Sequence, residues 1–73
     1  MPKLPVVSGR ELIKYLASKG FRPVRQRGSH VFLRSDGQYT TVPLENRIGP
    51  GLLLKILAQV GITREQFMKE WGA

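Results

Sequence analysis

Apolar residues recur at helical spacing near the start of the chain. They form one stripe, made of Leu12, Ile13, Leu16 and Ala17. Ser8 and Glu11 have the spacing of a capping box, and Val7 and Leu12 have the spacing of a hydrophobic staple. Gly20 is the residue type that commonly follows a helix end. The pattern therefore predicts a helix that begins after Ser8 and stops before Gly20. Ahead of it, Pro2 and Pro5 predict an extended segment over residues 1–7.

A second helical pattern follows the loop expected over residues 43–51. Its apolar positions are Leu53, Ile56, Leu57 and Val60. Pro50 suits the first turn of a helix and Gly61 suits the position after its end. The leucines of this segment are assigned to the core, and Lys55 is expected on the face away from the leucine stripe.

A short third helix is predicted at the end of the chain. Thr63 and Gln66 repeat the capping-box spacing, and Ile62 and Phe67 repeat the staple. We expect Trp71 to close over the edge of the core.

The segments between the first two helices have strand character. We expect strands over 21–27, 29–34 and 38–43, with a turn at Gly28 and a hairpin at Asp36-Gly37. Pro23 favours an edge position for the first strand, since proline cannot donate to a ladder. The chain is therefore predicted to be an α+β fold of order α-β-β-β-α-α. Its three-stranded antiparallel sheet would carry the helices on one face.

Alternation along the strands assigns each side chain to a face of that sheet. The covered face is expected to carry Ser29, Val31, Leu33, Thr40 and Val42. The open face is expected to carry His30, Phe32, Arg34, Tyr39 and Thr41. The first strand is harder to assign because of Pro23; if Val24 points inward, Arg25 and Arg27 point outward.

Length and composition limit the possible classes. At 73 residues we expect one domain over residues 1–73. No cysteine is present, so disulfides and thiolate metal sites are excluded, and one histidine with five carboxylates argues against a structural zinc site. No apolar run approaches the length of a membrane span, and the N-terminus lacks a secretory signal. We expect no membrane association, and a cytoplasmic protein.

The charge balance points to a polyanionic partner. Twelve Lys and Arg face five Asp and Glu, which gives a formal net charge of +7. Nucleic acid is the leading explanation for so basic a small chain. Two alternatives remain: a solvated basic surface, and a surface neutralised by an acidic protein partner.

The most basic stretch, "RQRGSHVFLR", holds the single histidine, His30. Arg25, Arg27 and Arg34 are candidates for phosphate contacts, or are ordinary solvated strand residues. Phe32 and Tyr39 are candidates for base stacking or for contact with a partner protein. Lys55 is a further candidate for a phosphate contact. By position alone, His30 would be a surface residue that binds phosphate.

The residues "SGRELIKYLASKGF", "RQRGSHVFLR", "TVP" and "AQVGI", in this order, resemble the HicA-like mRNA interferase toxins of type II toxin-antitoxin modules. The resemblance runs from Ser8 to Phe67, and its most specific element is Arg25 to His30. It implies a fold like the double-stranded RNA-binding domain. It also implies RNA cleavage that needs neither metal nor cofactor and that inhibits translation as a stress response.

The same resemblance assigns roles to residues and names a partner. It makes His30 the catalytic residue, with Gly28 and Ser29 as its supporting motif, and it implies a HicB-type antitoxin that covers the active site. One departure is visible: relatives have a Lys-Gly-Thr-like stretch where this chain has Pro50-Gly51-Leu52. A lysine and a hydroxyl are thereby lost at a helix N-terminus, which is a natural phosphate site.

Metal-free RNA cleavage uses the 2′-hydroxyl as nucleophile and needs a base to remove its proton. Histidine suits this role because its ordinary pKa lies near about 6.5. A single histidine excludes a two-imidazole pair, so the leaving oxygen would be protonated by water, Tyr39, a lysine, or His30 in a later step. Two other classes stay open: a non-catalytic RNA-binding module, and an interaction protein that docks an acidic partner.

Overall fold

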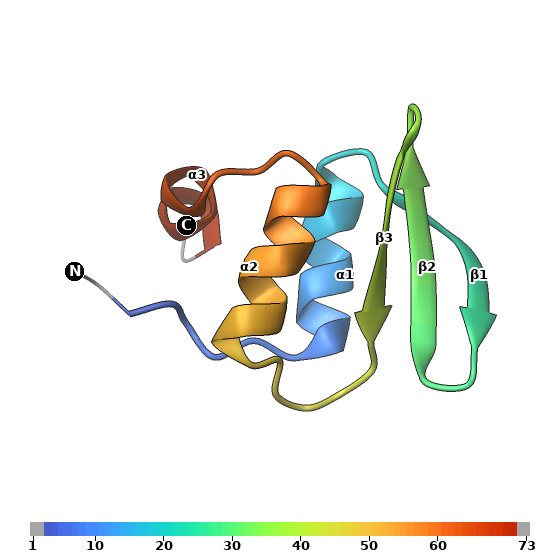
Figure 1. Cartoon of the computed structure of the whole chain (residues 1–73), viewed down its shortest axis with the longest axis horizontal. Coiled ribbons are helices and arrows are strands. Elements are labelled where there is room, and N and C mark those ends of the chain that lie inside the picture. Colours follow the sequence, from blue (N-terminus) through green and yellow to red (C-terminus); the bar gives the residue numbers. More distant parts are fainter. Residues whose placement is uncertain (1–2, 72–73) are drawn as a thin grey trace.

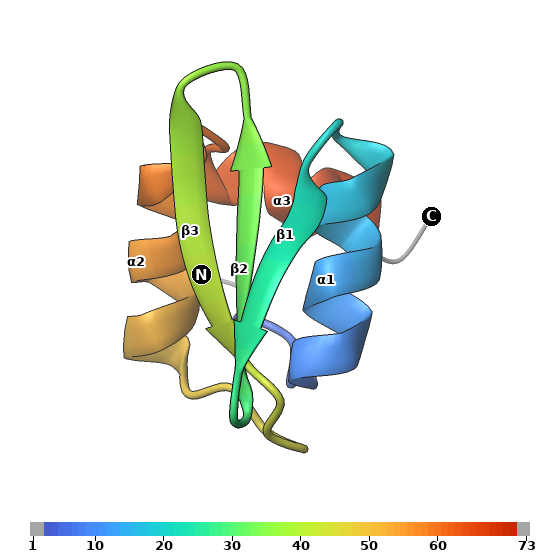
Figure 2. The same ribbon diagram turned by 90° about the vertical axis from the view of Figure 1, so that its right-hand side faces the viewer.

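The computed structural model describes residues 3–71 and has the element order expected from the sequence (Figure 1). The elements are α1 (Gly9–Ser18), β1 (Arg22–Arg27), β2 (His30–Ser35), β3 (Gln38–Pro43), α2 (Pro50–Gln59) and α3 (Arg64–Trp71). The strands form an antiparallel sheet in the order β1-β2-β3. Both α1 and α2 lie on one side of it, and the other side is open (Figure 2). The predicted α+β architecture is confirmed.

Helix α1 begins and ends as its sequence predicts. The Ser8 hydroxyl accepts from the Glu11 amide at 3.1 Å, and the Ser8 amide donates to the Glu11 carboxylate at 3.0 Å, which completes the capping box. After the helix, Gly20 has a φ of +92°, a conformation that glycine adopts without steric cost. Leu12 and Leu16 are buried, whereas Ala17, the last residue of the predicted apolar stripe, is exposed.

The segment before α1 is only partly described. Pro2 lies outside the described residues, so its effect on the extended segment is not seen. Val7 is buried and pairs with Ile48, whose amide donates to the Val7 carbonyl at 2.8 Å. The chain before α1 is thereby joined to the loop before α2.

The sheet presents the predicted faces. Val31, Leu33, Thr40 and Val42 are all buried against the helices. Ser29 was expected among them, and this was wrong: it lies in the β1–β2 turn, outside the strand, and is exposed. The β2–β3 hairpin turns through Asp36 and Gly37, both with positive φ (36° and 83°), as a type I′ turn requires.

Strand β1 departs from simple alternation because of a bulge. Its pairing with β2 shifts between Pro23 and Arg25, which leaves Val24 without a partner. Val24 is 61% exposed, so it is not a core residue. The extra residue returns Arg22 to the same face as Arg25, opposite Arg34 on β2.

Helix α2 packs on the sheet through Leu53, Ile56 and Leu57, which are buried as predicted. Leu52 and Leu54 are 36% and 40% exposed, so the assignment of every leucine here to the core was wrong. These two leucines flank the buried stripe of α2.

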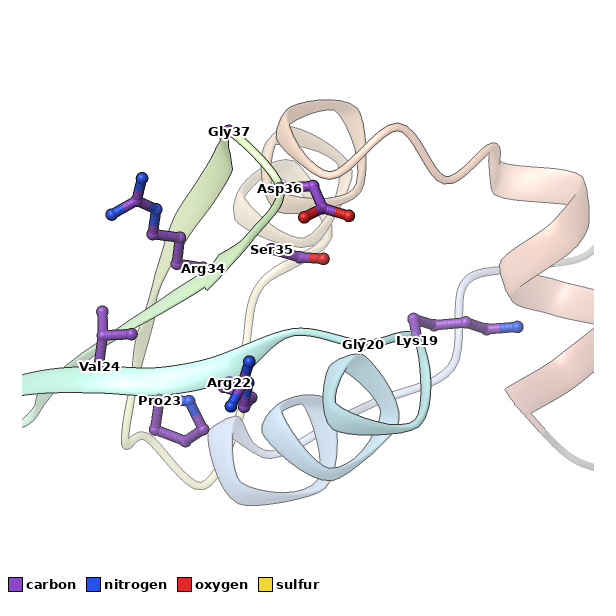
Figure 3. A pocket seen from close by; sticks show the side chains of 9 residues that line it. All are labelled: Lys19, Gly20, Arg22, Pro23, Val24, Arg34, Ser35, Asp36 and Gly37. Carbon is purple, nitrogen blue, oxygen red and sulfur yellow. The ribbon is translucent and has the colours of Figure 1, made fainter.

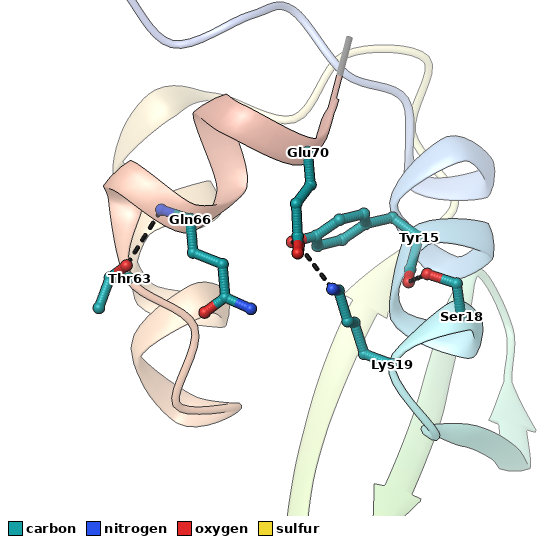
Figure 4. Close-up of polar contacts among 6 residues, drawn as sticks. All are labelled: Tyr15, Ser18, Lys19, Thr63, Gln66 and Glu70. Carbon is teal, nitrogen blue, oxygen red and sulfur yellow. Dashed lines mark hydrogen bonds and ion pairs between the residues drawn. The ribbon is translucent and has the colours of Figure 1, made fainter. Parts of the chain in front are cut away.

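Helix α3 is fixed to α1 by aromatic contacts and by polar contacts at Glu70, and Figure 4 shows the polar contacts. The rings of Phe67 and Trp71 lie 5.2 and 5.7 Å from that of Tyr15, centroid to centroid, and Phe67 is fully buried. The Tyr15 hydroxyl donates to Glu70 at 2.7 Å, and the Lys19 ammonium pairs with the same carboxylate at 2.6 Å. Trp71 thus closes the core edge, as expected.

These contacts shift two pKa values. Burial, followed by the hydrogen bond to Glu70, raises the pKa of the Tyr15 hydroxyl. The hydrogen bond from Lys19, followed by that from Tyr15, lowers the pKa of the Glu70 carboxyl. At the start of α3 the Gln66 amide donates to the Thr63 hydroxyl at 3.1 Å, which is half of the predicted capping box.

Candidate active site and nucleic-acid interface

His30 is the first residue of β2 and is exposed on the open face of the sheet. Two contacts fix the turn that precedes it. The Gln26 side-chain amide donates to the Gly28 carbonyl at 3.0 Å, and the Leu44 amide donates to the Ser29 carbonyl at 2.6 Å. Gly28 has a φ of +59°, which an L side chain rarely adopts. Gly28 and Ser29 therefore shape the turn that presents His30.

A groove of about 330 Å³ lies beside His30, between β3 and α2. It brings His30 together with Tyr39 from β3 and Lys55 from α2, all three of which the sequence proposed as site residues. Thr41 and Glu45 also line it and were not proposed. The groove therefore places an imidazole, a phenol and an ammonium around one space.

The groove is held by a contact in its wall. The buried Thr40 hydroxyl donates to the side-chain oxygen of Gln59 at 2.6 Å, which ties α2 to β3. Gln59 lies four residues after Lys55 and therefore on the same side of the helix. This bond fixes the part of α2 that carries Lys55. Nothing in the sequence paired Thr40 with Gln59, since the two are distant along the chain.

The loop after β3 is held against the start of α1. The Gly9 amide donates to the Glu45 carbonyl at 2.8 Å. A Cβ atom at residue 9 would overlap the Pro43 carbonyl oxygen, so only glycine allows this approach. Pro43 and Glu45 line the His30 groove, and the contact fixes that side of it.

A second hollow, of about 480 Å³, lies further along the open face. This hollow is lined by predicted phosphate-binding and stacking residues, namely Arg25, Phe32, Arg34 and Tyr39. The Arg25 guanidinium lies over the Phe32 ring, with 5.8 Å between its central carbon and the ring centroid. Tyr39 is 71% exposed, so its ring is the more accessible of the two.

Positive charge gathers on this face. Across the β1–β2 ladder Arg27 lies opposite His30, Arg25 opposite Phe32, and Arg22 opposite Arg34. Within residues 3–71, none of these four arginines forms an ion pair. Arg22 was not proposed as a site residue, because only the bulge at Val24 places it on the open face. The predicted site residues are thus distributed over one continuous surface.

Residues 3–71 contain no group of three or more His, Cys, Asp or Glu side chains placed to hold a metal ion. None of the helices described is long and apolar enough to cross a membrane.

The protein is thus a small basic α+β domain whose open sheet face carries arginines without ion pairs among the described residues, an accessible tyrosine ring and a histidine beside a groove. Comparison with protein families narrows this class. A family model described as the HicA toxin of bacterial toxin-antitoxin systems matches residues 9–62. The chain belongs to the HicA toxin family. Comparisons with curated proteins and with solved structures gave no significant match. The matched range includes the whole sheet and both of its covering helices but ends before α3.

Proposed function

We propose that this HicA toxin is an endoribonuclease that cleaves mRNA in the cytoplasm and so stops translation. The observation that carries the proposal is the position of His30: exposed, in a groove with Lys55 and Tyr39, on a sheet face whose arginines have no counter-ion within the described residues. The family membership makes the protein a toxin, and the chemistry of the groove suggests how it acts.

In the proposed reaction, His30 is the general base. Its unprotonated ring nitrogen takes the proton of a ribose 2′-hydroxyl, and the 2′-oxygen attacks the adjacent phosphorus. The new bond joins O2′ to phosphorus and the bond from phosphorus to O5′ breaks. The products are a 2′,3′-cyclic phosphate and a 5′-hydroxyl once the leaving oxygen has gained a proton.

Charged and hydroxyl groups near His30 complete the scheme. Lys55 lines the groove and Arg27 lies opposite His30, which supports the proposal that they stabilise the charge growing on the phosphate oxygens. The Tyr39 phenol lines the same groove and is a candidate to protonate the leaving oxygen. Water, Lys55 and protonated His30 are the other candidates.

A HicB-type antitoxin is the proposed partner. A ribonuclease that tolerates many sequences would damage its own cell unless restrained. The open face offers an exposed ring at Tyr39 and several arginines, which suit a partner with apolar and acidic side chains. Such a partner would compete with RNA directly. Hydrogen exchange on the complex should then show protection over residues 25–41, and protection confined to 63–71 would instead indicate an indirect route.

A non-catalytic RNA-binding module is the second candidate. One observation favours it: His30 has no hydrogen-bond partner that orients its ring within residues 3–71. Catalytic hydrogen bonds often form only in the substrate complex, so this observation does not exclude catalysis.

The test compares the protein with its His30→Ala variant on single-stranded RNA in EDTA. The protein should cleave RNA and leave DNA intact, and the variant should lose about 10²- to 10⁴-fold in rate, the usual contribution of a positioned base. Unfolding by urea should be unchanged, because His30 is exposed. If neither protein cleaves but both bind RNA equally well, the binding module is correct.

A further inference from the structure

A third hollow, of about 700 Å³, lies at the other end of β2 from His30 (Figure 3). Residues from the end of α1, the start of β1 and the β2–β3 hairpin line it, and they include Arg22, Arg34 and Lys19. Lys19 points away from the two arginines, toward α3, where it pairs with Glu70. The uncompensated positive charge of this hollow therefore comes from Arg22 and Arg34.

The pairing of these two arginines is unfavourable in the free protein. Arg22 and Arg34 lie directly opposite each other on neighbouring antiparallel strands, where like charges repel. Asp36 also lines the hollow, yet it forms no ion pair with either arginine in the described part of the chain. A bound anion would relieve the repulsion, and the planar guanidinium groups match the oxygens of a phosphate.

The three hollows are neighbours, because each shares lining residues with the next. The Arg22 hollow shares Val24, Arg34 and Gly37 with the middle hollow, which in turn shares Tyr39 with the His30 groove. The neighbouring hollows thus mark a path across the sheet from Arg22 to His30. His30 and Arg34 are four residue steps apart along β2, or about 14 Å at the usual strand rise.

We propose that a single-stranded RNA follows this path, and that Arg22 and Arg34 bind a backbone phosphate remote from the bond that lies at His30. The inference rests on the proposed function, which places the scissile bond at His30. The exposed ring of Tyr39 and the Arg25 guanidinium on Phe32 offer stacking surfaces along the path. Only unpaired bases can stack on them, since a duplex hides its base faces.

The experiment uses RNA strands that are 2′-O-methylated at every position but one. The single free 2′-hydroxyl fixes which bond can be cleaved, and hence which bond lies at His30. Strands are then extended on the 5′ side or on the 3′ side of that position, and affinity is measured against salt. Extension on one side should increase affinity once the strand reaches the Arg22 hollow.

The variant Arg22→Ala/Arg34→Ala should abolish that gain. It should also lower the slope of log K against log salt by about 0.7 for the extended strand, the value for one phosphate of a single strand. The shortest strand, which does not reach the Arg22 hollow, should lose only as much affinity as it loses when two positive charges are removed from another exposed site. The matched control is Arg10→Ala/Lys14→Ala, which removes the same charge from exposed positions of α1. The control should keep the full gain.

Three results would overturn the inference. An equal loss in the α1 control would mean that only net charge matters. An equal loss for the shortest and extended strands would mean that Arg22 and Arg34 do not form a remote site. Tighter binding of a duplex of the same sequence would mean that the occupant is not a single strand. Failure of the proposed function has a different signature: the length-dependent gain persists, but the free 2′-hydroxyl position is never cleaved.

Discussion

The α1–α3 contact and the open face of the sheet are built from the same kinds of side chain. In the first, the Lys19 ammonium lies 5.7 Å from the centroid of the Tyr15 ring and pairs with Glu70 at 2.6 Å. In the second, the Arg25 guanidinium lies 5.8 Å from the centroid of the Phe32 ring. No carboxylate pairs with Arg25 there, as far as residues 3–71 are concerned.

The difference is the counter-ion. Around Tyr15 each polar group has a partner, so the contact stabilises the fold and offers little to a ligand. On the open face the cations gather without partners, which is unfavourable for the protein alone and favourable for binding an anion. The comparison predicts that variants in the first region change stability, and that variants in the second change RNA binding and cleavage.

The loss of an aromatic ring should separate the two regions most strongly. Phe67→Ala removes a fully buried ring and should lower the free energy of unfolding by about 3–5 kcal/mol. Tyr39→Ala removes an exposed ring and should change it by less than about 0.5 kcal/mol. Urea denaturation measures both. In RNA binding the order should reverse, with Tyr39→Ala weakening the complex by about 1–3 kcal/mol if a base stacks there. Equal losses of unfolding free energy in Phe67→Ala and Tyr39→Ala would contradict the proposed difference between the two regions.

The loss of one hydroxyl should have a smaller effect. Thr40→Val removes the buried bond to Gln59 and should lower the free energy of unfolding by about 0.5–1.5 kcal/mol. Thr41→Val makes the same change one residue later, on the open face, where the hydroxyl has no hydrogen bond within the described residues. The free energy of unfolding should change less in Thr41→Val than in Thr40→Val. Cleavage should also slow in Thr40→Val if the bond positions Lys55; full stability loss with an unchanged rate would show that the bond is only structural.

The smallest expected effect is on how the free energy of unfolding falls at acid pH. The pKa of Glu70 is lowered in the folded protein, so its contacts stabilise the fold above its ordinary pKa of about 4.5. That contribution is lost as the pH falls through the lower, folded pKa. Glu70→Gln should therefore flatten the fall in unfolding free energy below pH 4.5, as measured by urea denaturation at several pH values. RNA affinity at neutral pH should not change. If Glu70→Gln left the fall in unfolding free energy at acid pH unchanged, another carboxylate would be responsible for that fall.

Local signals predicted most of the fold. The capping box at Ser8, the Asp36-Gly37 turn and the leucine spacing of α2 each depend on neighbours in the sequence. The errors had non-local or geometric causes. Ser29 was counted as a strand residue because a turn can end one residue later than its sequence suggests. Leu52 and Leu54 are leucines on the flanks of α2, where spacing alone does not say how wide the buried stripe is.

The candidate site was predicted in composition but not in arrangement. Tyr39 and Lys55 were named beside His30, yet the groove that unites them depends on how α2 packs against β3. Arg22 was missed because a bulge beside Pro23 changes the alternation of β1, and no residue pattern announces a bulge. Whether the arginines form ion pairs depends on where all five carboxylates lie. Only the folded structure gives those positions.

The most direct test is the chemistry of the RNA ends. A strand with one free 2′-hydroxyl is incubated in EDTA with the protein or with His30→Ala, and the fragments are identified by mass. We predict a 2′,3′-cyclic phosphate on one fragment and a 5′-hydroxyl on the other, with neither formed by the variant. A 5′-phosphate end, cleavage of a strand without any 2′-hydroxyl, or the same fragments at the same rate from His30→Ala would contradict the assignment of His30 as the base.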